Sequence, residues 1–193
     1  MSIQLIRPTL DALPSYRDAL TRGWSPDTTS DATIGRQLAA IADDPAAFIA
    51  RMEDLDAKGP PIVLPDGTEV RRLPGFGRWL WDGDFAGAFS FRYDPERGEA
   101  LPPTCLGHIG YTVPAWKRRR GYATRGLGML LDEVRAFPLR FVTITTAQDN
   151  IASQKVITAN GGRLVERFVT EPAHGAAEHL RWRIDLASLA APG

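Results

Sequence analysis

The spacing of apolar and polar positions predicts a chain that mixes strands and helices. The segment "IQLIRPT" has the short period of a strand before it meets a proline, so we predict a strand over residues 3–7. A helix over residues 9–22 follows, with Thr9 as its cap. After a polar connection, "DDPAAFIARMEDLDAKG" predicts a second helix that begins at a proline and ends at Gly59.

Proline and glycine crowd residues 59–77, "GPPIVLPDGTEVRRLPGFG", and no regular period persists there. We predict a long structured loop, in which the turn signal Asp66-Gly67 can form a small hairpin. Long loops in compact domains often frame binding sites, although a mere insertion is an equal alternative. Two β-rich runs then flank Asp82-Gly83, which predicts a second hairpin.

The second half of the chain alternates strands and helices. The segment "CLGHIGYTV" and the β-branched run over residues 139–146 predict two strands with a helix between them. The apolar face of that helix consists of Ala123, Leu127, Leu130, Leu131 and Val134. Strand, helix and strand form a βαβ unit. A helix from Asn150 to Asn160 follows, and two antiparallel strands then close the sheet.

Composition predicts one soluble, cytoplasmic domain over residues 1–193. The 23 basic residues balance 23 acidic ones, which argues against a protein that binds nucleic acid over a broad face. Cys105 is the single cysteine, so an intramolecular disulfide and a cysteine-based zinc site are excluded, and we expect no metal. The chain shows neither a signal-peptide pattern nor a run of ~20 apolar residues, so we expect no membrane association.

Four consecutive cations, Lys117 to Arg120, stand directly before Gly121 and the predicted start of a helix. A helix N-terminus exposes unpaired amide hydrogens and the positive end of the helix dipole, so it is a natural phosphate site. Gly121 would let a ligand approach the backbone, and Ala123 keeps the first turn small. The segment therefore predicts an anion site, with a solvated charged surface as the simpler alternative.

The pattern Arg118-x-x-Gly121-x-Ala123 follows the strand "HIGYTV" and Pro114, and here the chain resembles the GNAT superfamily of acetyl-CoA-dependent N-acetyltransferases. The resemblance covers residues 76–168. It extends to a group of predicted acetyltransferases that carry "HIGY", "RRRGYAT" and "DNIAS". It implies an α/β (α+β) fold with a central mixed, mostly antiparallel twisted sheet flanked by helices. It also implies acetyl-CoA as the co-substrate.

The resemblance assigns roles to individual residues. The Val113 backbone would bind the pantetheine arm and polarise the thioester carbonyl. Asn150 and Ser153 would approach the pantetheine or the sulfur. The pyrophosphate would be bound by Arg118, Arg119, Arg120, Gly121, Tyr122, Ala123 and Thr124.

Direct transfer of acetyl to an amine also needs a base and, for the leaving thiolate, an acid. Many relatives carry a glutamate near the position of His108, so His108 is the candidate base, with a structural strand histidine as the alternative. The tyrosine that often serves as the acid is replaced by Ile157. Tyr111 or Ser153 can substitute, as can water, although His108 and Tyr111 face opposite sides of a regular strand.

The leading hypothesis is an N-acetyltransferase acting on a small-molecule or peptide amine. The alternatives are a coenzyme A sensor without catalysis and a nucleic-acid-binding module built on "WKRRRGYATR". No motif identifies the acceptor. Asp82 and Asp84 can attract an ammonium group, but formation of the turn explains both residues equally well. We expect His174 and His179 to be surface residues and Cys105 to be an inert small residue. Exposed strand edges would permit a homodimer.

Overall fold

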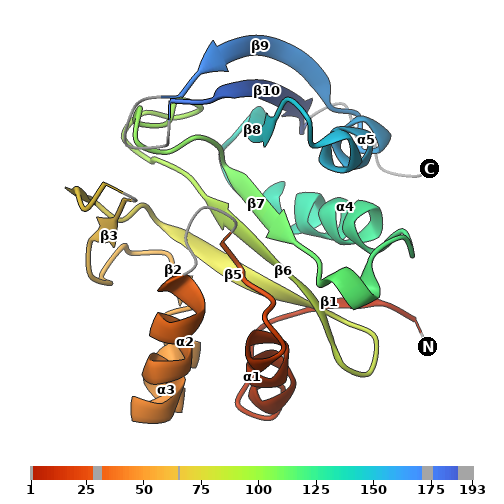
Figure 1. Cartoon of the computed structure of the whole chain (residues 1–193). Helices are drawn as coiled ribbons and strands as arrows, with labels where there is room; N and C mark the ends of the chain where they lie inside the picture. Colours follow the sequence, from red (N-terminus) through yellow and green to blue (C-terminus); the bar gives the residue numbers. More distant parts are fainter. Residues whose placement is uncertain (1, 28–31, 65, 171–175, 187–193) are drawn as a thin grey trace.

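A computed structural model describes residues 2–27, 32–64, 66–170 and 176–186 (Figure 1). In chain order, its elements are β1 (Gln4–Ile6), α1 (Leu13–Thr21), α2 (Ala32–Asp43), α3 (Pro45–Ala50), β2 (Glu53–Asp54), β3 (Ile62–Val63), β4 (Glu69–Val70), β5 (Gly75–Trp81), β6 (Phe85–Arg92), β7 (Ile109–Thr112), the short 3-10 helix η1 (Ala115–Lys117), α4 (Tyr122–Val134), β8 (Phe141–Ala147), α5 (Ile151–Ala159), β9 (Arg163–Val169) and β10 (Glu178–Asp185). The predicted α/β class is confirmed.

The strands form two main sheets. One has the order β1-β5-β6-β7, with β2 also paired to β5, and the other has the order β8-β10-β9. The sheets meet where the His108 amide donates to the Thr143 carbonyl at 2.8 Å. A Cβ atom at Gly107 would lie 3.1 Å from that carbonyl, so glycine permits this close approach. The strands predicted on either side of the central helix, β7 and β8, therefore lie in separate sheets rather than in one.

Two apolar cores lie on the two faces of the larger sheet. Helices α1, α2 and α3 contribute to one core, and α4 and α5 contribute to the other together with the smaller sheet (Figure 1). Successive side chains of a strand point to opposite faces, so Trp79 enters the first core and Leu80 the second. The β7 strand is left at the edge of this sheet, and η1 connects it to α4.

The N-terminal third differs most from the prediction. Helix α2 was missed, because residues 25–34 were interpreted as a polar connection. The second predicted helix ends at Ala50 rather than Gly59, and β2 follows it. The Met52 carbonyl accepts the Gly77 amide, and Glu53 pairs with Phe76, so pairing with β5 replaces the helix. The small hairpin of β3 and β4 is confirmed.

Candidate functional site

The loop before α4 presents a row of free backbone amides. Gly121 caps the 13-residue helix with φ +71°, a conformation that suits glycine, and Arg119 also has positive φ. The first helical bond runs from the Arg125 amide to the Gly121 carbonyl at 3.1 Å. No amide of residues 119–124 donates to an acceptor in the part of the chain that the structure describes. These donors, at the positive end of the helix dipole, can bind an anion.

Lys117 and Tyr122, which lie on either side of the three arginines, hold this segment against the β5–β6 turn. Lys117 Nζ lies 2.8 Å and 2.9 Å from the Asp82 carboxylate oxygens, and the Tyr122 hydroxyl donates to Asp82 at 2.7 Å. Burial raises the pKa of Asp82, but these hydrogen bonds outweigh it and hold that pKa below its usual range. Asp82 is therefore occupied, which weakens its predicted role in attracting an acceptor ammonium.

The three arginines of the segment differ in what they contact. Arg118 Nε donates to the Val113 carbonyl at 3.0 Å and so ties the loop to the end of β7. Arg119 and Arg120 are exposed, and neither forms an ion pair within the described residues. Both are therefore available to an anion bound at the amides.

A cavity of about 760 Å³ lies along the larger sheet and reaches the start of α5. Tyr111 and Ser153 both line it, and their hydroxyl oxygens are 2.7 Å apart. Tyr111 also stacks on Phe89, with ring centroids 5.5 Å apart. Burial raises the pKa of Tyr111 to about 12, although the bond to Ser153 opposes the shift. The structure therefore brings together the two side chains predicted to replace the usual acid.

The start and the core of α5 explain the other predicted residues of this segment. Asn150 lines the cavity and caps the helix, accepting the Ser153 amide at 3.1 Å. Ile157 is completely buried in the core formed with α4. The residue at the position of the usual tyrosine is therefore an apolar core side chain, which cannot donate a proton.

His108 is completely buried and is not among the residues that line the cavity. Its Nδ1 accepts the Thr143 amide at 3.1 Å, and the Thr143 hydroxyl lies 2.9 Å away. The proton is therefore on Nε2, which has no partner among the described residues. Burial, and then the charge of Arg92, lower the pKa of His108 to about 4. Its role as the base stays a prediction, which this geometry does not favour.

His179 on β10 is a cavity residue that the sequence interpretation placed on the surface. It pairs with Ala147 of β8, and the Asn150 amide donates to the Ala147 carbonyl at 3.2 Å. Its Nδ1 lies 3.1 Å from the Ala177 carbonyl, which can only accept a hydrogen bond. Nδ1 therefore carries the hydrogen and leaves the Nε2 lone pair free to accept a proton. His174 lies outside the described residues.

Other predicted features have less to contribute. Cys105 is half-buried, and its thiol donates weakly to the Gly107 carbonyl at 3.6 Å. No group of three or more histidine, cysteine or acidic residues in the described ranges could hold a metal ion. No helix among the described elements has the length and apolar character needed to cross a membrane.

The buried state of His108 predicts an acid-sensitive step in stability. The unfolded chain binds a proton near pH 6.5, whereas the folded chain resists protonation until about pH 4. The stability that depends on neutral His108 is therefore fully present above pH 6.5. As the pH falls toward 4, the free energy of unfolding decreases by up to roughly 3 kcal/mol. Urea unfolding across this window should show a smaller loss in His108→Gln than in the wild type. Equal losses would contradict the assignment.

Comparisons with known proteins found one family model and a set of similar solved structures. A model of the acetyltransferase (GNAT) domain matches residues 17–163. No curated protein matches the sequence. Mycobacterium smegmatis RimJ, solved with a CoA disulfide, is 20% identical, with a TM-score of 0.63 over 98% of this chain and 84% of that chain.

Two other solved structures are also similar. A Salmonella typhimurium acetyltransferase that modifies the N-terminal serine of ribosomal protein L7/L12 is 14% identical, with a TM-score of 0.62 over 96% of this chain and 95% of that one. The microcin C7 self-immunity acetyltransferase MccE, in complex with acetyl-CoA and AMP, is 12% identical, with a TM-score of 0.59 over 95% and 92% of the two chains. At these identities the similarity shows a common fold.

Proposed function

Because the chain belongs to the GNAT acetyltransferase family, we propose that it transfers the acetyl group of acetyl-CoA to a primary amine of a small molecule or peptide. The observation that carries this proposal is the row of free amides before α4, at the end of the strand that lines the cavity. Similar structures that contain CoA or acetyl-CoA support the donor. The relative that modifies an N-terminal serine supports a peptide amine as one class of acceptor.

The residues before α4 fit a coenzyme A pyrophosphate. We assign its oxygens to the amides of residues 119–124, with Arg119 and Arg120 as nearby cations. The space in front of Gly121 is open, because a Cβ atom there would meet nothing within 4 Å. Val113 remains the proposed pantetheine contact. Its carbonyl already accepts from Arg118, so pantetheine binds through the Val113 amide or displaces that bond.

The cavity residues suit direct transfer. The amine nitrogen forms a bond to the acetyl carbon, and the carbon–sulfur bond breaks. We propose that the His179 Nε2 lone pair takes the proton from the amine, directly or through water. Tyr111 is protonated at neutral pH, as any tyrosine with a pKa near 10 would be, and burial raises its pKa further, to about 12. The Tyr111–Ser153 pair can therefore give a proton to the leaving thiolate, after which either hydroxyl is reloaded from solvent.

Calorimetric titration with acetyl-CoA, coenzyme A and dephospho-coenzyme A tests the donor site. Assay of thiol release with a panel of amines then tests transfer. We expect binding of all three ligands and amine-dependent thiol release. Binding without release for any amine would favour the sensor. Absence of binding would reject the proposal.

The nucleic-acid alternative loses support from the contacts of its own motif. Trp116 lies under the guanidinium of Arg22, 3.8 Å from the ring centroid, and the Tyr122 hydroxyl and Lys117 are bound to Asp82. The motif therefore offers fewer free cations and aromatic faces for stacking bases than its sequence suggests. Salt-dependent binding of single-stranded nucleic acid that coenzyme A does not compete would restore this alternative.

The hydroxyl pair predicts a modest and shared loss of turnover. Tyr111→Phe and Ser153→Ala should each lower kcat about 10-fold, and the double variant should lose little more, because the two groups act as one proton donor. The acetyl-CoA dissociation constant should change little, which separates loss of chemistry from loss of binding. Full turnover in Tyr111→Phe would end this assignment.

A further inference from the structure

Arg92, the last residue of β6, lines the cavity beside β7. Its guanidinium donates to the Ser90 hydroxyl and, at 3.3 Å, to the Gly107 carbonyl. A Cβ atom at Gly110 would lie 3.7 Å from one terminal nitrogen and 4.0 Å from the other. Because glycine has no side chain there, the β7 backbone leaves this side of the guanidinium uncovered.

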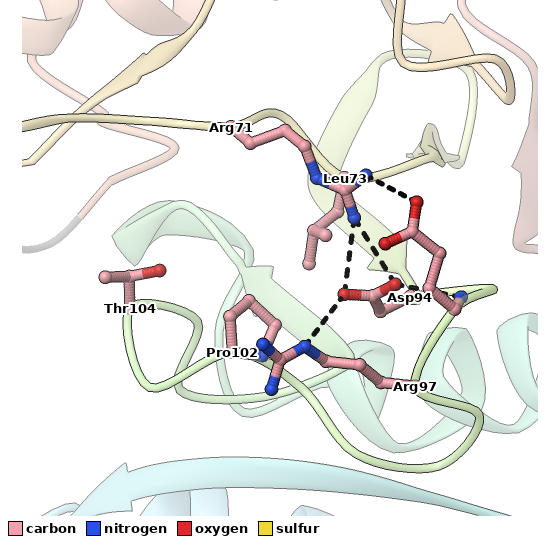
Figure 2. Close-up of a pocket in the computed structure, with 7 residues that line it drawn as sticks. Arg71, Leu73, Asp94, Arg97, Pro102 and Thr104 are labelled. Atoms are coloured by element: carbon pink, nitrogen blue, oxygen red, sulfur yellow. Dashed lines mark hydrogen bonds and ion pairs between the residues drawn. The ribbon is translucent and has the colours of Figure 1, made fainter.

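Four other arginines in or near the cavity wall have their charge offset by carboxylates. A nitrogen of Arg71 lies 3.3 Å from an oxygen of Asp94. Figure 2, a close-up of a smaller pocket that shares Arg71 with the cavity, shows Arg97 approaching the same buried carboxylate from the other side. Arg78 bonds Glu53 and Glu133, and Arg72 lies 3.8 Å from an Asp54 oxygen. Arg51 also lines the cavity without an ion pair among the described residues, but it is exposed to water.

Arg92 differs because it is half-buried and forms no ion pair with a carboxylate among the described residues. The Ser90 hydroxyl and the Gly107 carbonyl accept hydrogen bonds from Arg92, but these neutral groups do not neutralise its positive charge. The positive charge of Arg92 acts on a buried group, because it is the main cause, after burial, of the lowered pKa of His108. A partly desolvated cation without a counter-ion is costly unless a ligand supplies the anion.

We infer that the acceptor amine carries a carboxylate group, which Arg92 binds through charge-assisted hydrogen bonds in the cavity. The inference rests on the proposed acetyltransferase function and specifies its acceptor. Gly110 precedes Val113 by three residues, which is about 10 Å along a strand. The carboxylate therefore lies a short chain away from the amine that meets the thioester. Free amino acids and peptides with an acidic residue near the N-terminal amine both have this chemistry.

Matched acceptor pairs test the inference in the wild-type enzyme. One pair is a free amino acid and its carboxamide, and the other is an aspartate-containing and an asparagine-containing tripeptide with the same N-terminal residue. In at least one of the two pairs, we expect kcat/KM for the acceptor that has the carboxylate to exceed that of its neutral partner on the order of 10- to 100-fold. The pair that shows the preference identifies the source of the carboxylate. Equal values in both pairs would overturn the inference while the proposed function stands.

Arg92→Gln should remove the preference, by lowering kcat/KM for the carboxylate member much more than for its neutral partner. Arg97→Gln is the control, because it makes the same change in net charge outside the cavity wall and leaves Asp94 paired with Arg71. Circular dichroism and acetyl-CoA titration establish that each variant is folded.

If Arg92→Gln does not fold, Arg92→Lys, which keeps the charge but loses paired bonding, should reduce the preference. A preference that survives in folded Arg92 variants would overturn the inference. Absence of transfer to every amine would reject the proposed function and the inference together.

Discussion

Acetyl-CoA is expected to lose at least about 100-fold in affinity when Gly121 is replaced by glutamate. The new carboxylate would stand in front of the free amides of residues 119–124, where the pyrophosphate is proposed to bind. Two anions would then compete for one set of donors. Because a Cβ atom at Gly121 meets nothing within 4 Å, the loss should come from charge and access rather than from a clash. Calorimetric titration of both proteins with acetyl-CoA measures it directly.

The backbone of Gly121 requires a matched control, because any side chain at φ +71° costs about 1–2 kcal/mol. Gly98 has φ +63°, is also surrounded by open space, and lies in the loop after β6. Gly98→Glu therefore introduces similar strain and the same charge away from α4, and it should bind acetyl-CoA as the wild type does. Unchanged affinity in folded Gly121→Glu would show that the pyrophosphate lies elsewhere.

Features set by short-range chemistry were predictable from the sequence. Asn150 caps α5 through the Ser153 amide, and Gly121 begins α4, as the local residue pattern indicated. Both hairpin turns lie at Asp-Gly pairs. The contact between Tyr111 and Ser153 is different, because these alternative candidates for the acid lie 42 residues apart in the sequence and only the fold brings them together. The functional roles of these residues remain predictions, because their positions alone do not establish chemistry.

Features set by distant partners were not predictable in this way. Residues 53–54 continue a helical pattern, but pairing with β5 and the buried Arg78 make them a strand. Helix α2 is a different case, because Ile34, Leu38 and Ile41 have helical spacing and pack in the first core. That signal was present in the sequence and was overlooked among polar neighbours.

His108 and His179 show that a sequence motif does not identify every residue that lines a site. His108 stands beside the recognised motif, yet the Thr143 backbone occupies its Nδ1 and the sheet junction buries it. His179 has no motif around it and lies beyond residues 17–163, which the family model matches. It reaches the cavity only because β10 pairs with β8. Proximity in the folded chain, rather than proximity in sequence, makes it the better candidate base.

Replacing His179 by alanine should lower kcat about 100-fold or more, because a positioned base typically contributes that much to proton transfer. Acetyl-CoA affinity should be retained, since the proposed donor contacts lie on β7, the loop, α4 and the start of α5, and His179 is not one of them. Added imidazole should restore part of the rate. Steady-state rates of thiol release with and without imidazole measure these effects.

His108→Gln is the matched control, because it removes the other described histidine of this region while its amide oxygen can still accept from the Thr143 backbone. We expect its kcat to stay within about 3-fold of the wild type, since removing a buried neutral side chain affects packing rather than proton transfer. The opposite pattern, a large loss of kcat in folded His108→Gln with nearly full kcat in His179→Ala, would return the role of base to His108. Loss in neither variant would instead indicate that water alone accepts the proton, so the cavity would act mainly by holding the amine against the thioester.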